Sequence, residues 1–401
     1  MSTANLSLSR LGRMRETMSG YVERDELPGL VTLVSRRGDT VVEALGSTAR
    51  GGTAPMRRDT IFRISSITKP MTAVAAMMLV ESSKLRLDDP VDRFLPELAD
   101  RQVLQRTTGP IDETVPATRP ITVRDLLTMR QGFGHIMSRS AAGYPIVKAA
   151  TEAGILHGPP KPQQGPSADE LLERLSALPL MHQPGERWMY ELGMELLGVL
   201  IARVAEQPLG EFMAEHIFEP LGMVDTAFSV DADRRARLAT SYEENAETGE
   251  LELYDAPDGE WSRPPVLESG AAGLVSTADD VLAFYRMLLD GGRGPRGRLL
   301  ARPSVEAMTR DQLEPDHRKG AEVFFGETCS WGLGMGVVIR RDAPPDVPGR
   351  FGWDGGLGCS AWADPKEQLV GILLTQRAVS SPAPPPIYQD FWTSVYQAID
   401  D

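Results

Sequence analysis

Cysteine is almost absent from this chain of 401 residues, which contains only Cys329 and Cys359. Two isolated cysteines predict no disulfide framework, and neither has the neighbouring Cys or His that a zinc site requires. The five histidines show no metal-ligand spacing, and no P-loop or dinucleotide-binding glycine motif is present. We therefore expect no metal and no organic cofactor, and the cysteine usage favours a reducing, cytoplasmic location.

Long apolar runs are also missing: no stretch approaches the roughly 18 to 20 apolar residues that a membrane span requires. The N-terminal segment carries Arg10, Arg13 and Arg15 where a secretory signal needs an unbroken apolar core, and it indicates a mature amphipathic helix. Basic residues are fewer than acidic ones, 42 against 56, which gives a formal net charge of −14. A field of this sign repels phosphate backbones and anionic lipids, so we expect a soluble protein that binds neither nucleic acid nor membranes.

Segments typical of strands lie at the two ends of the sequence. Residues 30–35 and 40–45 are β-rich runs around a turn, which indicates a hairpin. Strand patterns return at 334–340, 360–363 and 368–375, and a final helix is expected over 387–399. The sequence therefore predicts an α/β (α+β) fold in which both ends contribute to one central antiparallel sheet.

The middle of the sequence is mostly helical in pattern. Helices are expected at 123–129, 168–178, 194–205 and 210–218. We expect an α/β domain from residues 1–84 and 266–401, and an inserted, mainly helical domain from 85–265. Residues 132–183 include a polar, Pro-rich stretch that indicates either a long surface loop or lid, or a plain insertion.

The most specific chemical pattern is Ser66-Ile-Thr-Lys69 at the start of an apolar helix over 73–80. A spacing of three puts the hydroxyl and the amine on one helix face, and the helix N-terminus favours a developing alkoxide. The chain has 6 Lys among its 42 basic residues, and this is its one Ser-x-x-Lys. Such a pair is an activated nucleophile. The alternative is that Ser65 or Ser66 caps the helix beside a solvated Lys69.

The surrounding segment FRISSITKPMTAVAAMML resembles the nucleophile helix of the penicillin-recognising serine hydrolases, which include class C β-lactamases, DD-peptidases and family VIII carboxylesterases. In that superfamily a catalytic tyrosine follows a Pro-Gly and precedes a Leu-Leu-Gly helix. Tyr190 stands in this layout, between Pro184-Gly185 and the Leu-Leu-Gly that ends at Gly198. The resemblance implies a β-lactamase/DD-peptidase-like fold in which Tyr190 helps to deprotonate Ser66 and passes the proton to the leaving group. The alternative is a half-buried core tyrosine.

The third family motif is a triplet of consecutive residues on a strand that faces the nucleophile. Its first residue is Lys or His, its second is Thr or Ser, and its third is Gly. The corresponding triplet here is Trp353-Asp354-Gly355, similar to the Trp-x-Gly of family VIII esterases. The resemblance implies an oxyanion hole made by the backbone N–H groups of Ser66 and Gly356. Because Gly355 and Gly356 are adjacent and identical, the resemblance leaves open by one residue which glycine supplies the second N–H. A Gly-rich bulge with Trp353 in the core is the alternative.

Two departures from the family bear on the substrate. The Tyr-x-Asn of the superfamily becomes Tyr190-Glu191-Leu192, and Trp353 replaces the cationic Lys of the triplet. Both changes remove groups that hold peptides and β-lactams in the family. We expect Leu192, Trp353, Asp354 and Gly355 to bind the substrate, with an apolar wall that suits an uncharged ester.

The resulting hypothesis is a serine carboxylesterase that hydrolyses small-molecule, short-chain carboxylic esters through an acyl-Ser66 intermediate. No Gly-x-Ser-x-Gly is present, which excludes the α/β-hydrolase elbow. The enzymatic alternatives are a β-lactamase or D-amino-acid peptidase and an acyltransferase of the same fold. The non-enzymatic alternative is a catalytically silent homologue that binds a ligand.

Overall fold

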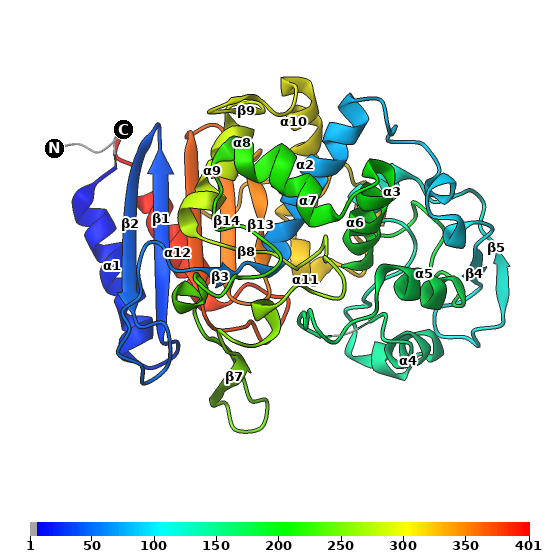
Figure 1. Ribbon diagram of the computed structural model, residues 1–401, viewed down its shortest axis with the longest axis horizontal. Coiled ribbons are helices and arrows are strands. Elements are labelled where there is room, and N and C mark those ends of the chain that lie inside the picture. Colours follow the sequence, from blue (N-terminus) through cyan, green and yellow to red (C-terminus); the bar gives the residue numbers. More distant parts are fainter. Residues whose placement is uncertain (1–5, 157) are drawn as a thin grey trace.

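The centre of the structure is a seven-stranded sheet in which every neighbouring pair of strands is antiparallel. The computed structural model describes residues 6–156 and 158–401. In spatial order the strands are β11 (Cys329–Trp331), β12 (Gly336–Val338), β13 (Phe351–Gly355), β14 (Cys359–Asp364), β15 (Leu369–Thr375), β1 (Gly29–Arg36) and β2 (Asp39–Gly46). β1 pairs with β15, with Leu30 opposite Thr375 and Arg36 opposite Leu369. The two ends of the chain therefore build one sheet, as the sequence predicted (Figure 1).

Helices cover both faces of this sheet. At one face α1 (Leu8–Glu23) packs on α12 (Pro386–Gln397), and at the other α9 (Ala278–Leu289) lies against β14, β15 and β1 (Figure 1). α12 approaches closely because Gly371 has no side chain, and a Cβ there would lie 2.6 Å from the ring of Trp392. On the other face Tyr285 of α9 lies near Phe351 of β13, with 6.4 Å between ring centroids. The first five residues of the expected N-terminal helix lie outside the described residues.

Between β2 and α9 the chain is mainly helical, and its part from α3 to α6 lies to the right in Figure 1. Its helices are α2 (Thr68–Glu81), α3 (Val123–Leu127), α4 (Pro145–Glu152), α5 (Ala168–Ser176), α6 (Leu192–Ala205), α7 (Leu209–Met213) and α8 (Glu219–Leu221). The helix expected over 210–218 is α7 followed by a π-helical turn, Ala214–Phe218. The domain division at residues 84/85 and 265/266 stays a prediction.

The remaining elements are short. Two-stranded pairs are formed by β3 (Phe62–Arg63) with β8 (Val275–Ser276), β4 (Gln102–Leu104) with β5 (Thr114–Pro116), β6 (Ser241–Glu244) with β7 (Leu251–Asp255), and β9 (Arg293–Gly294) with β10 (Gly297–Arg298). Two further helices are α10 (Arg302–Met308) and α11 (Glu322–Phe325). Across the ranges that the structure describes, no helix has the length and apolarity to cross a bilayer.

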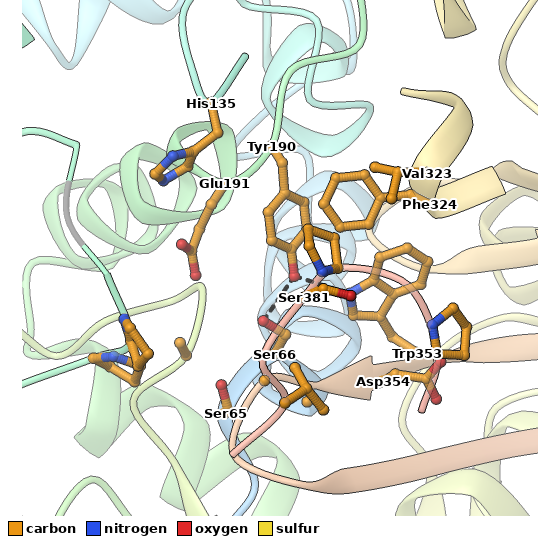
Figure 2. A pocket seen from close by; sticks show the side chains of 18 of the residues that line it. Ser65, Ser66, His135, Tyr190, Glu191, Val323, Phe324, Trp353, Asp354 and Ser381 are labelled. Atoms are coloured by element: carbon orange, nitrogen blue, oxygen red, sulfur yellow. Dashed lines mark hydrogen bonds between the residues drawn. The ribbon is translucent and has the colours of Figure 1, made fainter. Parts of the chain in front are cut away.

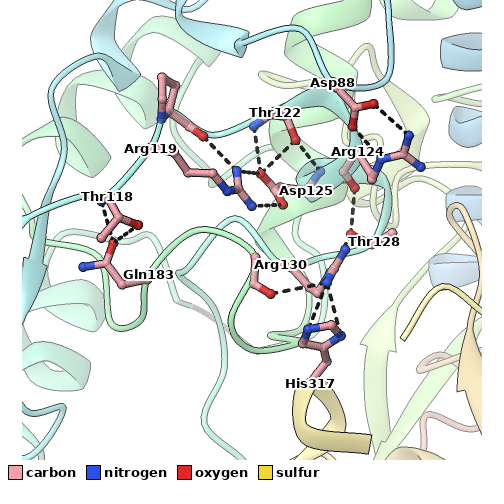
Figure 3. Close-up of polar contacts among 12 residues, drawn as sticks. Asp88, Thr118, Arg119, Thr122, Arg124, Asp125, Thr128, Arg130, Gln183 and His317 are labelled. Atoms are coloured by element: carbon pink, nitrogen blue, oxygen red, sulfur yellow. Dashed lines mark hydrogen bonds and ion pairs between the residues drawn. The ribbon is translucent and has the colours of Figure 1, made fainter. Parts of the chain in front are cut away.

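A hydrogen-bonded cap fixes the start of α3 (Figure 3). Thr122 Oγ1 accepts from the Asp125 N–H at 3.2 Å, and Asp125 Oδ2 accepts from the Thr122 N–H at 2.9 Å. Arg119 donates twice to the same carboxylate, at 2.6 and 2.9 Å. This capping box satisfies N–H groups that a helix start leaves unpaired. The chain that leaves α3 then pairs with the segment before α6, where Met129 O accepts from the Met189 N–H at 2.8 Å.

The segment expected to be a loop over 132–183 contains two helices, α4 and α5, of which the sequence indicated only the second. Its Pro-rich part is hydrogen-bonded to residues 254–266. Lys161 Nζ donates to Tyr254 O at 2.8 Å, Gln163 Nε2 donates to Glu260 O at 3.0 Å, and the Val266 N–H donates to Pro162 O at 2.9 Å. These bonds hold the Pro-rich segment against the body of the protein.

Candidate active site

Ser66 lies in a 3-10 turn (Ser65–Ile67) that runs directly into α2. The alternative in which Ser65 or Ser66 caps this helix is wrong, because no side chain makes a capping hydrogen bond there. The Ser66 hydroxyl is instead engaged by Lys69 and Tyr190. Ser65 has a φ of +46°, in the left-handed region that a non-glycine residue rarely adopts. Ser66 is only 4% exposed, and its Oγ faces a cavity.

Lys69 is fully buried, which contradicts the alternative of a solvated lysine. Its Nζ lies 2.8 Å from Ser66 Oγ, 2.9 Å from Ala271 O and 3.4 Å from Glu191 Oε1. Burial lowers the pKa of Lys69, but the neighbouring Tyr190 and Glu191 raise it, and the balance lies above the ordinary value. The amine is therefore held in its charged form at neutral pH.

Tyr190 completes a three-residue constellation. Its OH lies 2.8 Å from Ser66 Oγ (Figure 2). Lys69 Nζ lies 4.4 Å from the centre of the Tyr190 ring. Its backbone is fixed from the neighbouring segment, because the His135 N–H donates to Tyr190 O at 2.5 Å. The structure thus brings together Ser66, Lys69 and Tyr190, which are far apart in sequence.

Trp353 lines the same cavity from β13, and its indole Nε1 donates to Tyr190 OH at 3.0 Å (Figure 2). From the sequence, we expected Trp353 only as an apolar wall for the substrate. The structure adds a hydrogen bond from its indole to the phenol oxygen.

Trp353→Phe removes that N–H and keeps an aromatic ring. We expect kcat for ester hydrolysis to fall about ten- to hundredfold, since a hydrogen bond to a charged group contributes roughly 1.5 to 3 kcal/mol. Steady-state kinetics on a nitrophenyl ester would measure this loss. If kcat is unchanged and only KM rises, Trp353 acts on the substrate alone.

Asp354 follows Trp353 in β13, and both residues line the cavity. Its Oδ1 accepts from Ser360 Oγ at 2.5 Å and from Trp362 Nε1 at 2.9 Å. Burial raises the pKa of Asp354, and these hydrogen bonds oppose the rise. The carboxylate lines the cavity, but the neighbouring strand β14 already holds one of its oxygens. Leu192 and Gly355, the two remaining predicted substrate contacts, are buried and also line the cavity.

The turn after β13 lies against the residues that precede Ser66. A Cβ on Gly355 would lie 2.4 Å from Ile64 O, whereas the nearest atom to a Cβ on Gly356 is Ser65 Oγ at 3.9 Å. The peptide after Gly356 is fixed, because Gly356 O accepts from the Val379 N–H at 2.9 Å. Gly355 is therefore required for the close approach of this turn to the start of α2.

Gly355→Ala should lower the free energy of unfolding by about 1 to 3 kcal/mol, because the new methyl group overpacks against Ile64. Gly356→Ala is the matched control, and it should leave this free energy nearly unchanged because the site has room. Urea denaturation of both variants checks the contrast. Equal free energies of unfolding for Gly355→Ala and Gly356→Ala would show that a methyl group at position 355 does not clash with Ile64.

The cavity around these residues has a volume of about 770 Å³. Three parts of the sequence that are far apart contribute to its lining: residues 154–155 with 158–166, residues 322–326 and residues 379–385. Four of its lining residues in the first part and three in the third are prolines, which restrict backbone motion. Apolar side chains and prolines line most of the wall, and the Ser66 hydroxyl lies among them.

A protein-family model described as Beta-lactamase matches residues 14–389. The chain belongs to the β-lactamase family. Protein Rv1367c of Mycobacterium tuberculosis is 38% identical to it over 360 residues, which cover 87% of this chain and 86% of that protein. Esterase EstB of Burkholderia gladioli is 31% identical over 390 residues, with coverage of 92% and 91%.

Among solved structures, this β-lactamase family member is similar to EstCE1, described as a hydrolase with promiscuous acyltransferase activity. The TM-score is 0.79 at 26% identity, and the match covers 97% of this chain and 98% of that one. These relatives confirm the β-lactamase/DD-peptidase-like fold and the resemblance to family VIII carboxylesterases. They also support chemistry of the serine-hydrolase type for this chain.

Three residues of this β-lactamase family site were not predicted as site residues. Glu191 reaches Lys69, Phe324 of α11 packs on Tyr190 with 4.7 Å between ring centroids, and His135 lines the cavity beside Tyr190 (Figure 2). Glu191 was visible in the sequence as the middle residue of the altered Tyr-x-Asn motif. Phe324 lies 134 residues after Tyr190 and belongs to no motif, so only the fold shows it.

Proposed function

We propose that this protein is a carboxylesterase that works through an acyl-Ser66 intermediate. One observation carries the proposal: Ser66 Oγ lies 2.8 Å from both Lys69 Nζ and Tyr190 OH, at the wall of a largely apolar cavity. A serine hydroxyl becomes a nucleophile when a neighbouring base accepts its proton. The similarity to Esterase EstB supports the same reaction class.

In the acylation step Tyr190 accepts the proton of Ser66 as Ser66 Oγ attacks the ester carbonyl carbon. Lys69, as a cation, stabilises the phenol oxygen in its charged form, and the Trp353 N–H donates to the same atom. The backbone N–H groups of Ser66 and Gly356 stabilise the carbonyl oxygen as it becomes negative. Tyr190 then gives the proton to the departing alcohol oxygen, so the alcohol leaves and the acyl group stays on Ser66.

Deacylation repeats these steps with water. A water molecule attacks the acyl carbon and gives one proton to Tyr190, and Ser66 Oγ leaves and takes that proton back. The carboxylic acid is released, and the site returns to its starting protonation. Lys69 keeps its charge throughout, in agreement with its raised pKa.

The substrate we propose is an uncharged small-molecule ester with a short acyl chain. The wall contains Trp353 and Leu192 where lactam- and peptide-cleaving relatives carry a cation and an amide. A cavity of about 770 Å³ leaves room for an alcohol group much larger than the acyl chain. Trp353, Leu192 and Phe324 would contact the apolar parts of the ester.

This proposal is tested by measuring the rates at which the protein hydrolyses nitrophenyl butyrate and a chromogenic cephalosporin. The Ser66→Ala variant serves as the blank for each compound. We expect Ser66-dependent hydrolysis of the ester that greatly exceeds hydrolysis of the cephalosporin. The esterase proposal fails if only the cephalosporin is cleaved. If neither compound is cleaved by a folded protein, a ligand-binding role replaces the enzymatic one.

Acyl transfer is a second candidate, because it shares every step up to the acyl-enzyme and because EstCE1 is described as having promiscuous acyltransferase activity. An alcohol in the cavity would take the place of water and receive the acyl group. Adding alcohol acceptors to the esterase assay and measuring new ester against free acid separates the two reactions. Free acid as the main product supports hydrolysis.

A further inference from the structure

The charge balance around the buried amine of Lys69 involves Glu191, the middle residue of the altered Tyr-x-Asn motif. Lys69 Nζ has three acceptors, Ser66 Oγ, Ala271 O and Glu191 Oε1. An ammonium group has three N–H donors and satisfies all three acceptors at once. Of these acceptors only the Glu191 carboxylate carries a full negative charge.

A buried ammonium is unfavourable unless a negative charge lies close to it. Lys69 has no exposed surface, while the Glu191 side chain is 19% exposed and lies at the cavity wall. The Nζ to Oε1 distance of 3.4 Å is within ion-pair range. Glu191 is thus placed to stabilise the charged amine from the open side of the site, although water weakens its effect.

The other titratable groups around Lys69 come from few elements. Tyr190 precedes α6, and Glu195 lies one turn into α6, where it accepts a hydrogen bond from Ser269 Oγ. The loop at Ala271 supplies a neutral carbonyl, and α2 supplies Ser66. His135 lies on the segment bridged to Tyr190. Glu191 is the carboxylate that contacts Nζ directly.

We propose that Glu191 is a positioning residue that keeps Lys69 in its ammonium form, so that Tyr190, rather than Lys69, accepts the proton of Ser66. This inference rests on the proposed esterase function, and it assigns the roles of Lys69 and Tyr190 in that reaction: Lys69 stays charged, and Tyr190 accepts the proton. Glu191 contributes through Lys69 and takes no part in bond making. The raised pKa of Lys69, to which Glu191 contributes, agrees with this assignment.

The direction in which the pH profile of kcat/KM shifts distinguishes this assignment from the alternative in which neutral Lys69 is the base. Glu191→Gln removes the negative charge, which must lower the pKa of Lys69. If activity needs the ammonium form, the alkaline limb of the kcat/KM profile moves to lower pH in the variant. If instead neutral Lys69 were the base, the acidic limb would move to lower pH and the variant would gain activity near neutral pH.

The experiment compares pH profiles of nitrophenyl butyrate hydrolysis for the full-length protein and three variants. We expect Glu191→Gln to lose up to about tenfold in kcat/KM relative to wild type on the alkaline limb, at pH values above the lowered pKa of Lys69, because a lost opposite charge within a few ångströms typically shifts a pKa by about one unit or more. Glu191→Asp keeps the charge and should restore part of the alkaline activity. Glu322→Gln changes another cavity-lining carboxylate, which accepts from the Gly320 N–H and does not contact Lys69 in the described structure, and it should leave the pH profile in place.

The pH dependence of phosphonate labelling of Ser66, followed by intact-protein mass, gives a second readout that needs no turnover. The same alkaline loss of labelling rate is expected in Glu191→Gln. A gain in activity near neutral pH, or profiles that superimpose on wild type, overturns the assignment of Glu191 while the esterase proposal stands. If wild type neither labels nor hydrolyses the ester, the esterase proposal itself fails.

Discussion

Ser66→Ala is expected to lower kcat for ester hydrolysis by at least about 10⁴-fold, as the loss of a catalytic nucleophile does in other serine hydrolases. The acyl-enzyme cannot form without Oγ, and no other hydroxyl lies between Lys69 and Tyr190 in the structure as described. The free energy of unfolding should change little, because alanine fits the 3-10 turn before α2. Turnover of nitrophenyl butyrate and urea denaturation measure the two quantities.

Ser65→Ala is the matched control for this result. Ser65 adjoins Ser66, is equally buried and also lines the cavity, but its hydroxyl makes no contact with Lys69 or Tyr190 in the described structure. Its loss should cost far less activity. Comparable losses in the two variants would mean that the 3-10 turn as a whole, rather than the Ser66 nucleophile, determines activity.

Tyr190→Phe is expected to lower kcat by about 10² to 10⁴-fold, the usual contribution of a general acid–base group. The phenol oxygen is the atom that Ser66, Lys69 and Trp353 all approach, so its removal eliminates the base in acylation and the acid for the leaving alcohol. KM should change less than kcat, because the ring still lines the cavity. Steady-state kinetics with an activated nitrophenyl ester and with an unactivated alkyl ester measure both effects.

The two esters separate the roles of the phenol. A nitrophenolate departs without a proton, so the loss should be larger for the alkyl ester, whose alcohol needs one. Tyr21→Phe removes a remote tyrosine hydroxyl, which donates to Asp390 at 2.6 Å, and controls for general destabilisation. Equal rates for Tyr190→Phe and wild type on both esters would exclude Tyr190 as the acid–base group.

Much of the sheet could be predicted because its strands have strong local patterns. β1, β2, β14 and β15 are runs of β-branched and apolar residues between turns, and the expected ranges lie within one residue of the observed ends. The strand expected at 334–340 is the shorter β12, since Gly332 and Gly334 form a turn that leads in from β11. The short pairs β4–β5 and β6–β7 have no such local pattern. Hydrogen bonding to the partner strand, rather than a β-rich sequence, makes these segments strands.

The helical part was predicted where helices have an apolar face and a clear start. α5 combines both features because it begins with a capping box at Ser167, whereas α6 is strongly apolar but has no side-chain cap at its start. α4 was missed because Pro145 opens it inside a segment rich in Gly and Pro. The alternative of a cap from Ser65 or Ser66 failed for a functional reason: the site uses the Ser66 hydroxyl, so it is not available to the helix start.

The site could be predicted as a set of residues but not as a geometry. The spacing of Ser66 and Lys69 and the layout around Tyr190 indicated which residues to examine. The contact from Trp353 to the Tyr190 phenol depends on how β13 sits against α6, and no local pattern records that distance. The same holds for Glu191, whose charge becomes meaningful only when the structure places it 3.4 Å from Lys69 Nζ.

Intact-protein mass spectrometry after incubation with a nitrophenyl phosphonate ester tests the central claim most directly. We predict one covalent adduct on wild type with loss of nitrophenol, the same adduct formed more slowly on Tyr190→Phe, and no adduct on Ser66→Ala. Ser65→Ala should be labelled like wild type. An adduct that persists on Ser66→Ala, or a folded wild-type protein that takes none, would contradict the assignment of Ser66 as the nucleophile.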